Sequence, residues 1–168
     1  MRVLRFKYME MHEVEHLLPE MFEVLYSNMN LIAPSNNSYE SEYQIWVSHI
    51  VPALKVEYRR TILLYTVGQF AGYLRYYLNN SEQLFLIEDI QIKSEFQGIG
   101  LFSSCLRWLI KQLPKNVLYV QAYVDKRNVK SRAIMEHYGL RSIGENKNGI
   151  SLCLQCDYTA FYNNLFRI

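Results

Sequence analysis

Apolar and polar residues of this chain follow two periods, and the changes from one period to the other mark the predicted elements. Residues 2–9 alternate as a β-strand does. Apolar side chains then recur at helical spacing, at Val14, Leu17, Leu18, Met21, Phe22 and Leu25. After the polar connection 30–41, a second helical stretch runs from about Tyr43 to Tyr58. We expect Pro52 to kink or divide it, because proline removes a helix hydrogen bond.

Strand-like segments occupy the middle of the chain. Residues 59–80 predict two strands that turn near Gly68, and residues 81–93 predict a third. Successive strands joined by short turns are typical of a β-meander. We therefore expect these three strands to be neighbours in one sheet.

The second half of the chain mixes helices and strands. Its clearest helix is an apolar stripe that Pro114 closes, made of Leu101, Phe102, Cys105, Leu106, Leu109, Ile110 and Leu113. Residues 117–124 then predict a strand, residues 128–138 a short helix that Gly139 ends, and residues 141–156 a hairpin. This order, with no repeat or linker, predicts a single mixed α/β domain of the α+β kind over residues 1–168.

Composition narrows the classes of function. The chain has 168 residues, of which 50% are hydrophobic, enough for one core of ordinary size. A net charge of +2 without a long Lys/Arg block argues against a nucleic-acid partner. Three cysteines in apolar surroundings are typical of reduced core thiols and indicate a cytoplasmic protein. The apolar runs are too short to span a bilayer and no export signal is found, so no membrane association is expected.

One short motif suggests a metal. The segment HEVEH satisfies the H-E-x-x-H pattern of zinc peptidases, in which two histidines one helical turn apart bind the metal and the glutamate activates water. If Val14 and Leu18 face the core, however, His12 and His16 lie on nearly the opposite side of the helix, in solvent. A zinc peptidase acting through His12, Glu13 and His16 is therefore a remote alternative, and no metal is expected.

Gly98 and Gly100 lie between a strand-like run and a helix-like run. Glycines there let the backbone approach a ligand closely, and the N–H groups at a helix N-terminus form an anion site. A dinucleotide fingerprint with Ser103 as the third small residue fits poorly, because the next strand has no acid before Asp125. A P-loop fits less well, because no Gly-Lys-Ser/Thr follows. The remaining interpretation is a loop whose successive backbone amides bind a diphosphate.

With Gln97 included, the spacing is Q-x-x-G-x-F, within residues 87–102, IEDIQIKSEFQGIGLF. This stretch resembles the acyl-CoA motif of the GNAT N-acetyltransferase superfamily. A later segment, NVKSRAIMEHYGL, is similar to the superfamily's second motif, which here places Asn128, Ser131, Gly139 and Leu140. The matched stretches cover about residues 84–150. The resemblance implies a central, mostly antiparallel twisted sheet flanked by helices, with acetyl-CoA as the cosubstrate.

The resemblance also implies the residues that bind the cosubstrate. Backbone amides would hold the diphosphate, at Gln97, Gly98, Ile99, Gly100, Leu101 and Phe102. Main-chain groups of Ile90 and Ile92 would pair with the pantetheine arm, which Asn128 would also contact, with Ser131 one turn further along the same helix face. From the residues alone, Asn128 is equally an N-cap. The cations Lys126, Arg127, Lys130 and Arg132 near this helix start are interpreted as a solvated face, with CoA phosphates as the alternative.

Two neighbouring carboxylates are candidates for the general base. Strand alternation places Glu88 with apolar residues on one face and Asp89 with Ile87 and Gln91 on the other. Desolvation there would raise a carboxylate's pKa and suit it to accept a proton near neutral pH. We expect Glu88 to be the base. The choice between Glu88 and Asp89 stays open, because this strand bulges in related enzymes and a bulge upsets the alternation.

Two positions depart from the pattern of the superfamily. Phe102 stands where a glycine or alanine usually ends the phosphate loop, and either its ring turns into the core or the cosubstrate sits differently. Met135 stands where many members carry the tyrosine that protonates the departing thiolate, so the general acid is unassigned. Tyr138 and His137 are the nearby substitutes to test.

The resemblance implies an N-acetyltransferase that moves an acetyl or other short acyl group from acetyl-CoA to a primary amine of a small molecule or peptide, by direct attack in a ternary complex. A non-catalytic module of the same fold that binds acyl-CoA is the alternative, which Met135 and Phe102 motivate. Dimers are frequent among such domains, so a homodimer is compatible with the sequence. The acceptor amine is not indicated by any residue pattern.

Overall fold

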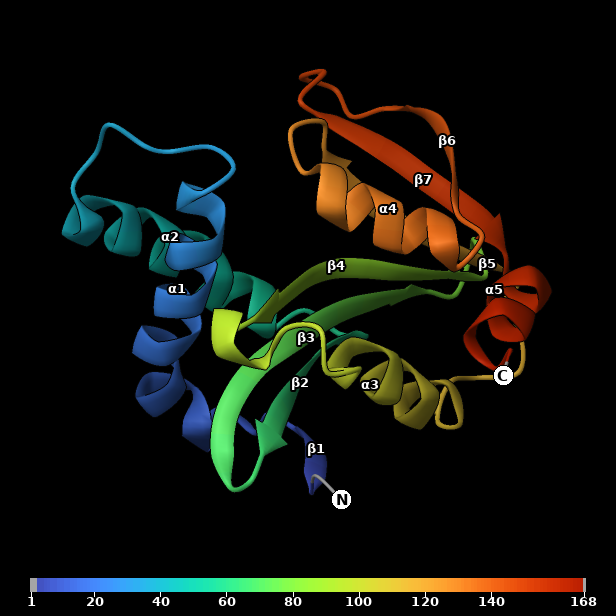
Figure 1. The fold of residues 1–168 in the computed structure, drawn as a ribbon, viewed down its shortest axis with the longest axis horizontal. Coiled ribbons are helices and arrows are strands. Elements are labelled where there is room, and N and C mark those ends of the chain that lie inside the picture. Colours follow the sequence, from blue (N-terminus) through green and yellow to red (C-terminus); the bar gives the residue numbers. More distant parts are fainter. Residues whose placement is uncertain (1–2, 168) are drawn as a thin grey trace. The chain divides into compact units, whose positions relative to one another are not determined.

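The structure contains the helices and strands predicted from the hydrophobic pattern, and one further helix follows them in the chain. The computed structural model describes residues 3–167 (Figure 1). Its helices are α1 (Val14–Asn30), α2 (Tyr39–Leu54), α3 (Leu101–Ile110), α4 (Val129–His137) and α5 (Tyr158–Leu165), with 3-10 turns η1 (Met11–Glu13) and η2 (Ser94–Phe96). Its strands are β1 (Leu4–Tyr8), β2 (Arg59–Thr66), β3 (Gln69–Asn79), β4 (Leu84–Ile92), β5 (Tyr119–Asp125), β6 (Arg141–Glu145) and β7 (Ser151–Asp157).

The strands form a mostly antiparallel sheet. Within residues 3–167 it has seven strands in the order β1-β2-β3-β4-β5-β7-β6. β1 with β2, β5 with β7 and β6 with β7 are antiparallel, whereas β4 and β5 are parallel, with Leu84–Ile87 facing Tyr119–Ala122. The predicted meander is confirmed, because β2, β3 and β4 are successive neighbours. The mixed α+β class predicted from the sequence is therefore correct.

Two compact units divide the chain, and β3 and β4 contribute to both. The first unit comprises the residues up to Arg75 together with Asp89–Leu101. The second comprises Tyr76–Glu88 together with the residues from Phe102 onward. Each unit has apolar residues of its own that are shielded from water, and each is described in turn.

The first unit packs α1 and α2 against β2 and β3. Met21 and Leu63 are fully buried beside Phe70 and Tyr73, and Trp46 of α2 packs against this cluster. Val14 and Leu18 face Ile50 of α2 in an adjoining cluster. The helix face predicted from the spacing of apolar residues is therefore the buried one.

The second helix of this unit differs from its prediction. α2 begins at Tyr39, after Ser38, whose side chain accepts a hydrogen bond from the Ser41 N–H at 3.2 Å. This serine is a good N-cap, and the cap extends the helix four residues earlier than predicted. Pro52 lies in the last turn and the helix ends at Leu54, so the proline does not divide it.

The second unit places α3, α4 and α5 with β5, β6 and β7. The α3 residues Cys105, Leu106 and Leu109 are fully buried, as the predicted stripe requires. The sequence did not predict α5, whose buried residues Phe161 and Leu165 are only one turn apart in an eight-residue helix. Contacts from elsewhere in the unit hold it, including a hydrogen bond from Arg107 Nε to the Leu165 carbonyl at 3.0 Å.

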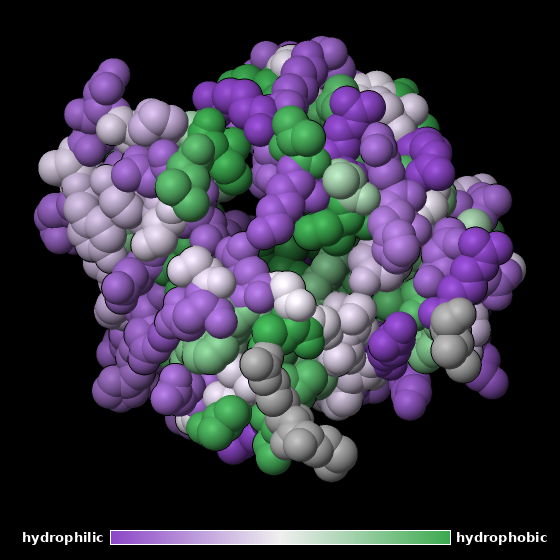
Figure 2. Space-filling model, viewed as in Figure 1, coloured by the Kyte–Doolittle hydropathy of each residue, from purple (hydrophilic) through white to green (hydrophobic). Residues whose placement is uncertain are grey.

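On the face shown in Figure 2, hydrophilic residues predominate, with hydrophobic residues exposed between them. Leu31, Val67 and Val129 are among the most exposed large apolar side chains of the protein. Such exposed residues are normal for a globular protein and carry no functional inference. Among the helices of residues 3–167, none combines the length and the apolar character needed to cross a bilayer.

Candidate functional site

The connection from β4 to α3, in the first unit, contains two glycines with left-handed backbone conformations. The turn η2 closes with the N–H groups of Phe96 and Gln97, which donate to the carbonyls of Lys93 and Ser94. Gly98 and Gly100 then take positive φ angles of 76° and 80°, and α3 begins at the next residue. An added Cβ at Gly98 would meet nothing within 4 Å, so the left-handed conformation, rather than lack of space, favours glycine there.

Backbone N–H groups gather where this loop enters α3. The Gln97 N–H donates to the Ser94 carbonyl at 3.3 Å and is therefore engaged within the protein. Among residues 3–167, the N–H groups of Gly98 and Ile99 make no backbone hydrogen bond. The first N–H groups of a helix, here from Leu101 onward, lack intrahelical acceptors and lie at the positive end of the helix dipole. In this structure the loop N–H groups without a backbone hydrogen bond are therefore those of Gly98 and Ile99.

The Gln97 side chain turns back into the first unit. Its Nε2 donates to the Ile92 carbonyl at 2.9 Å and lies 3.5 Å from Oδ1 of Asn28, on α1. The Ile92 carbonyl also accepts from Asn28 Nδ2 at 3.1 Å. Ile92 was predicted to pair its main chain with pantetheine, and its carbonyl is engaged within the protein in this structure. Asn28 could not be identified from the sequence, because no sequence pattern relates it to its hydrogen-bond partners, which lie more than sixty positions later in the chain.

The two candidate bases of β4 have different surroundings. Asp89 accepts the Tyr73 hydroxyl on Oδ2 at 3.0 Å and the Gln91 amide on Oδ1 at 2.8 Å, so both its oxygens are engaged. Burial, together with the Asp89 charge and hydrogen bond, raises the pKa of Tyr73 well above its usual value. The contact between Asp89 and Gln91 confirms that they share a face of the strand. Glu88 is half-buried and belongs to the second unit.

The predicted pantetheine contacts Asn128 and Ser131 lie at the start of α4, in the second unit. Asn128 is the N-cap, because its Oδ1 accepts the Ser131 N–H at 3.0 Å. The structural interpretation of this asparagine is thus confirmed. Its cofactor role stays a prediction, and Nδ2 is the donor that it would offer to a ligand.

The cations near this helix start mostly have acidic partners. Arg127 is bidentate on Asp125, with Nε to Oδ1 at 2.9 Å and Nη2 to Oδ2 at 2.7 Å. The Arg127 hydrogen bond holds the pKa of Asp125 below its usual value. Lys126 pairs with Glu145, and Arg132 pairs with Glu136. These pairs favour the interpretation of a solvated charged face over a phosphate site.

The candidates for the general acid lie in the second unit. Met135 is 3% exposed and carries no acidic proton. Tyr138 is buried, which raises the pKa of its phenol. The Phe102 ring packs edge-on against Tyr138, with centroids 5.8 Å apart, so this ring turns into the protein. His137 is exposed.

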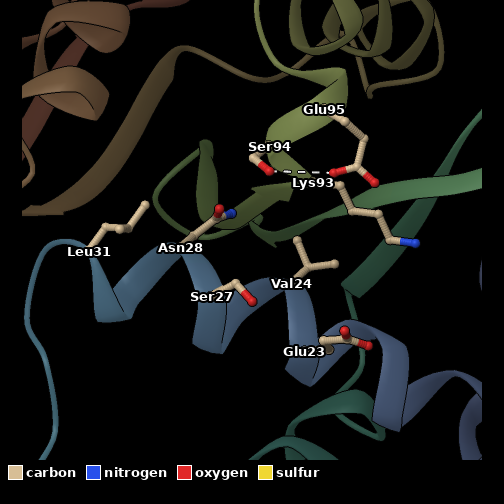
Figure 3. A pocket seen from close by; sticks show the side chains of 8 residues that line it. All are labelled: Glu23, Val24, Ser27, Asn28, Leu31, Lys93, Ser94 and Glu95. Carbon is tan, nitrogen blue, oxygen red and sulfur yellow. Dashed lines mark hydrogen bonds between the residues drawn. The ribbon is translucent and has the colours of Figure 1, made fainter.

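A pocket of about 230 Å³ opens in the first unit between α1 and the residues that follow β4 (Figure 3). Its lining is mostly polar and consists of Glu23, Val24, Ser27, Asn28, Leu31, Lys93, Ser94 and Glu95. Two carboxylates and one ammonium group therefore surround a volume somewhat below the usual range of small-ligand sites. No sequence pattern pointed to it, because its two walls come from distant segments.

The histidines of the H-E-x-x-H motif lie in solvent, as predicted. His12 and His16 are both exposed, and His12 Nδ1 lies 3.2 Å from a carboxylate oxygen of Glu10. Among residues 3–167 no group of three or more His, Cys, Asp or Glu side chains is placed to hold a metal ion.

Comparison with known proteins decides the family. The model of the Acetyltransferase (GNAT) family matches residues 13–140. The chain belongs to the GNAT acetyltransferase family. The resemblance drawn from the two sequence motifs is therefore confirmed. No curated protein matches this GNAT chain.

Solved structures show the same fold. An acetyltransferase from Thermus thermophilus is 22% identical, with a TM-score of 0.73, over 92% of this chain and 97% of its own. The PaiA N-acetyltransferase from Thermoplasma acidophilum, in complex with coenzyme A, is 13% identical, with a TM-score of 0.67, over 93% and 99%. The aminoglycoside acetyltransferase AAC(6')-Ib, in complex with coenzyme A and kanamycin, is 17% identical, with a TM-score of 0.68, over 96% and 98%. At these identities the likeness establishes the fold, and family membership supports an acyltransferase.

Proposed function

We propose that this GNAT protein transfers an acetyl or other short acyl group from acyl-CoA to a primary amine of a small molecule or peptide. The observation that carries the proposal is the loop before α3. Gly98 and Gly100 take left-handed conformations, and the N–H groups of Gly98 and Ile99 precede the N-terminus of a ten-residue helix. Such N–H groups and the helix dipole bind a diphosphate well. The CoA complexes of two proteins with the same fold agree with this ligand.

Binding at the loop involves backbone groups from Gly98 to Phe102, with Gln97 acting through its side chain to hold the start of the loop. Main-chain groups of Ile90 and the N–H of Ile92 are the proposed partners of pantetheine on β4. Asn128 is a further proposed partner, through Nδ2, with Ser131 beside it on α4. The identity of the acyl chain is left as acetyl or another short group.

Glu88 is the proposed general base. An alkylamine has a pKa of about 10, so it is protonated at neutral pH and needs a base before it can attack. Asp89 serves poorly, because both its oxygens already accept hydrogen bonds within the first unit. Glu88 would take the ammonium proton directly or through water. The C–N bond then forms as the C–S bond breaks, and the thiolate takes a proton from a donor for which Tyr138 is the first candidate. The second proton that the amine nitrogen loses replaces the one given up by this donor.

The second candidate function is a module that binds acyl-CoA without transferring the acyl group. The buried Met135, at the position of the usual proton-donating tyrosine, favours it. For both functions we propose one domain over residues 1–168 in the cytoplasm, and a homodimer is compatible with either. A small cationic acceptor fits the acyltransferase better than a nucleic acid does, given the net charge of +2.

Thiol release with a broad panel of amines tests the proposal. An acyltransferase releases CoA thiol with at least one amine, and Glu88→Gln lowers kcat about 100-fold or more while leaving CoA affinity unchanged. Glu82→Gln, which changes an exposed carboxylate ahead of β4, is the matched control. Saturable CoA binding without thiol release would favour the binding module. Absence of CoA binding at millimolar concentration would contradict both functions.

A further inference from the structure

A hydrogen-bonded chain of side chains in the first unit leads from β3 to the loop that opens α3. Its links join Tyr73 to Asp89, Asp89 to Gln91, Gln91 to Asn28, and Asn28 to Gln97. The distances between their polar atoms are 3.0, 2.8, 3.0 and 3.5 Å in that order. Figure 3 shows one member, Asn28, pointing from α1 toward the end of β4.

The carboxylate of Asp89 sets the direction of this chain. An ionised carboxylate only accepts hydrogen bonds, so Gln91 must turn its Nε2 toward Asp89. The Gln91 carbonyl oxygen then faces Asn28, which donates to it from Nδ2. This leaves Asn28 Oδ1 as the acceptor that faces Gln97 Nε2. The Asp89 carboxylate thus orients the Gln91 amide, and the Gln91 and Ile92 carbonyls together orient Asn28 and Gln97.

Burial makes the arrangement costly to break. Gln91 is 8% exposed and Tyr73 is fully buried. A buried amide or hydroxyl that loses its partner keeps the full cost of desolvation. Burial also keeps Tyr73 a protonated donor, because the pKa of its phenol is raised. The Asp89 end of the chain is therefore anchored in the core of the first unit.

The other end acts on the loop. The Ile92 carbonyl accepts both Asn28 Nδ2, at 3.1 Å, and Gln97 Nε2, at 2.9 Å. These bonds tie the end of β4 to the residue that directly precedes Gly98. Gly98 and Gly100 follow at left-handed φ angles, and a fixed preceding residue limits the conformations that their backbone can adopt.

We propose that Asp89, Gln91 and Asn28 are positioning residues, which hold the loop beginning at Gln97 in the conformation that binds the diphosphate of acyl-CoA. The inference rests on the proposed function, because it takes acyl-CoA as the ligand. It assigns these side chains to ligand affinity rather than to proton transfer. It also separates Asp89, which acts through other residues, from its neighbour Glu88.

The first test compares Asn28→Ala with Asn30→Ala, an exposed asparagine of the same helix. Asn28→Ala removes the links to Gln91, Ile92 and Gln97, so we expect the Kd for CoA and the KM for acetyl-CoA to rise about tenfold. The kcat stays within about threefold, because no reacting group is changed. Asn30→Ala leaves all three quantities unchanged.

Amide hydrogen exchange without ligand provides a readout that does not depend on the activity. Asn28→Ala accelerates exchange at the hydrogen-bonded backbone amides of Phe96 and Gln97 about tenfold relative to Asn30→Ala, because the turn that precedes the loop opens more often. Asp89→Asn, which keeps the shape of the side chain, has a smaller effect of the same kind. The Asp89→Asn variant no longer requires Gln91 to direct its Nε2 toward position 89, so the Gln91 side-chain amide can rotate. We therefore expect this variant also to raise the KM for acetyl-CoA while kcat is retained.

The outcomes separate the two proposals. Equal exchange and equal CoA affinity in Asn28→Ala and Asn30→Ala would overturn the positioning role. A loss of kcat with unchanged KM in Asp89→Asn would also overturn it, since Asp89 would then be part of the chemistry. A wild-type protein that binds no CoA contradicts the proposed function and the ligand named here, and exchange then decides alone whether Asn28 braces the loop.

Discussion

At the scale of single residues, Gly72 of β3 shows how closely two strands approach. A Cβ built at this position would lie 2.0 Å from the Gln91 carbonyl oxygen and 2.9 Å from the Ile92 Cα. Both atoms belong to the backbone of β4, which cannot move aside without breaking the sheet. Gly72→Ala should therefore lower the free energy of unfolding by about 3 kcal/mol, measured by denaturant titration.

Gly68 is the matched control for this glycine. It lies in the turn between β2 and β3 at a φ of 75°, with nothing within 4 Å of an added Cβ. Gly68→Ala should cost only about 1 kcal/mol, the penalty of a left-handed alanine. Equal losses in the two variants would show that backbone conformation, not the contact with β4, explains Gly72.

The ion pair of Asp125 and Arg127 predicts a pH dependence. Arg127 lowers the pKa of the Asp125 carboxyl in the folded protein, so the pair stabilises the fold above the unfolded pKa of about 4 and loses this effect as the pH falls through the lower folded value. Asp125→Asn should reduce the denaturant midpoint at pH 7, and the difference from wild type should narrow in acid. Arg127→Gln should show the same narrowing, and a difference that grew in acid would contradict the assignment.

At the scale of an element, substitutions of Asn128 at the start of α4 can distinguish a structural role of this residue from a ligand-binding role. Asn128→Asp keeps an acceptor for the Ser131 N–H and places a negative charge at the helix N-terminus, so the melting temperature should be retained. It removes the Nδ2 donor proposed to contact pantetheine. We therefore expect weaker CoA binding by calorimetry without a loss of stability.

Asn128→Ala completes that comparison. It removes the cap and should cost about 1 kcal/mol in addition to the loss of affinity. If Asn128→Asp binds CoA as tightly as the wild type does, Asn128 is an N-cap and nothing more.

At the scale of the whole molecule, CoA should stabilise the folded chain by mass action. A ligand that binds only the native state contributes about 2.7 kcal/mol at 100 times its Kd. For a protein of this size that corresponds to a rise in melting temperature of about 5–10 °C. Gly98→Val, which strains the left-handed loop, should show a smaller rise at the same CoA concentration. An unchanged melting temperature at millimolar CoA would contradict the proposed site.

The fold was predictable from the sequence to the extent that its signals are local. The apolar faces of α1 and α3 follow from residues one turn apart, and the β2–β3 turn follows from Gly68. The start of α2 was misplaced because its cap, Ser38, lies inside a polar stretch without apolar periodicity. The helix α5 was missed because its stability comes from packing rather than from its eight residues.

Contiguity in the chain explains which parts of the candidate site were found. Gln97, Gly98 and Gly100 are close in sequence, and their spacing alone pointed to a loop for a diphosphate. The interpretation of Gln97 nevertheless changed, because its side chain and its N–H both bond within the protein. The brace of that loop, Asn28, was invisible because it meets Gln91 across 63 positions of the chain.

By itself, the sequence determined the strands, the helices other than α5, the glycine loop and the family, because periodicity, turn residues and motif spacing act over a few neighbouring residues. Only the tertiary structure decided the partners of Asp89 and Gln97, because hydrogen bonds between distant residues depend on which helix packs beside which strand. The separate roles proposed for Glu88 and Asp89 arise in this way: the two are adjacent in the chain, but only Asp89 is shown bonded to both Tyr73 and Gln91.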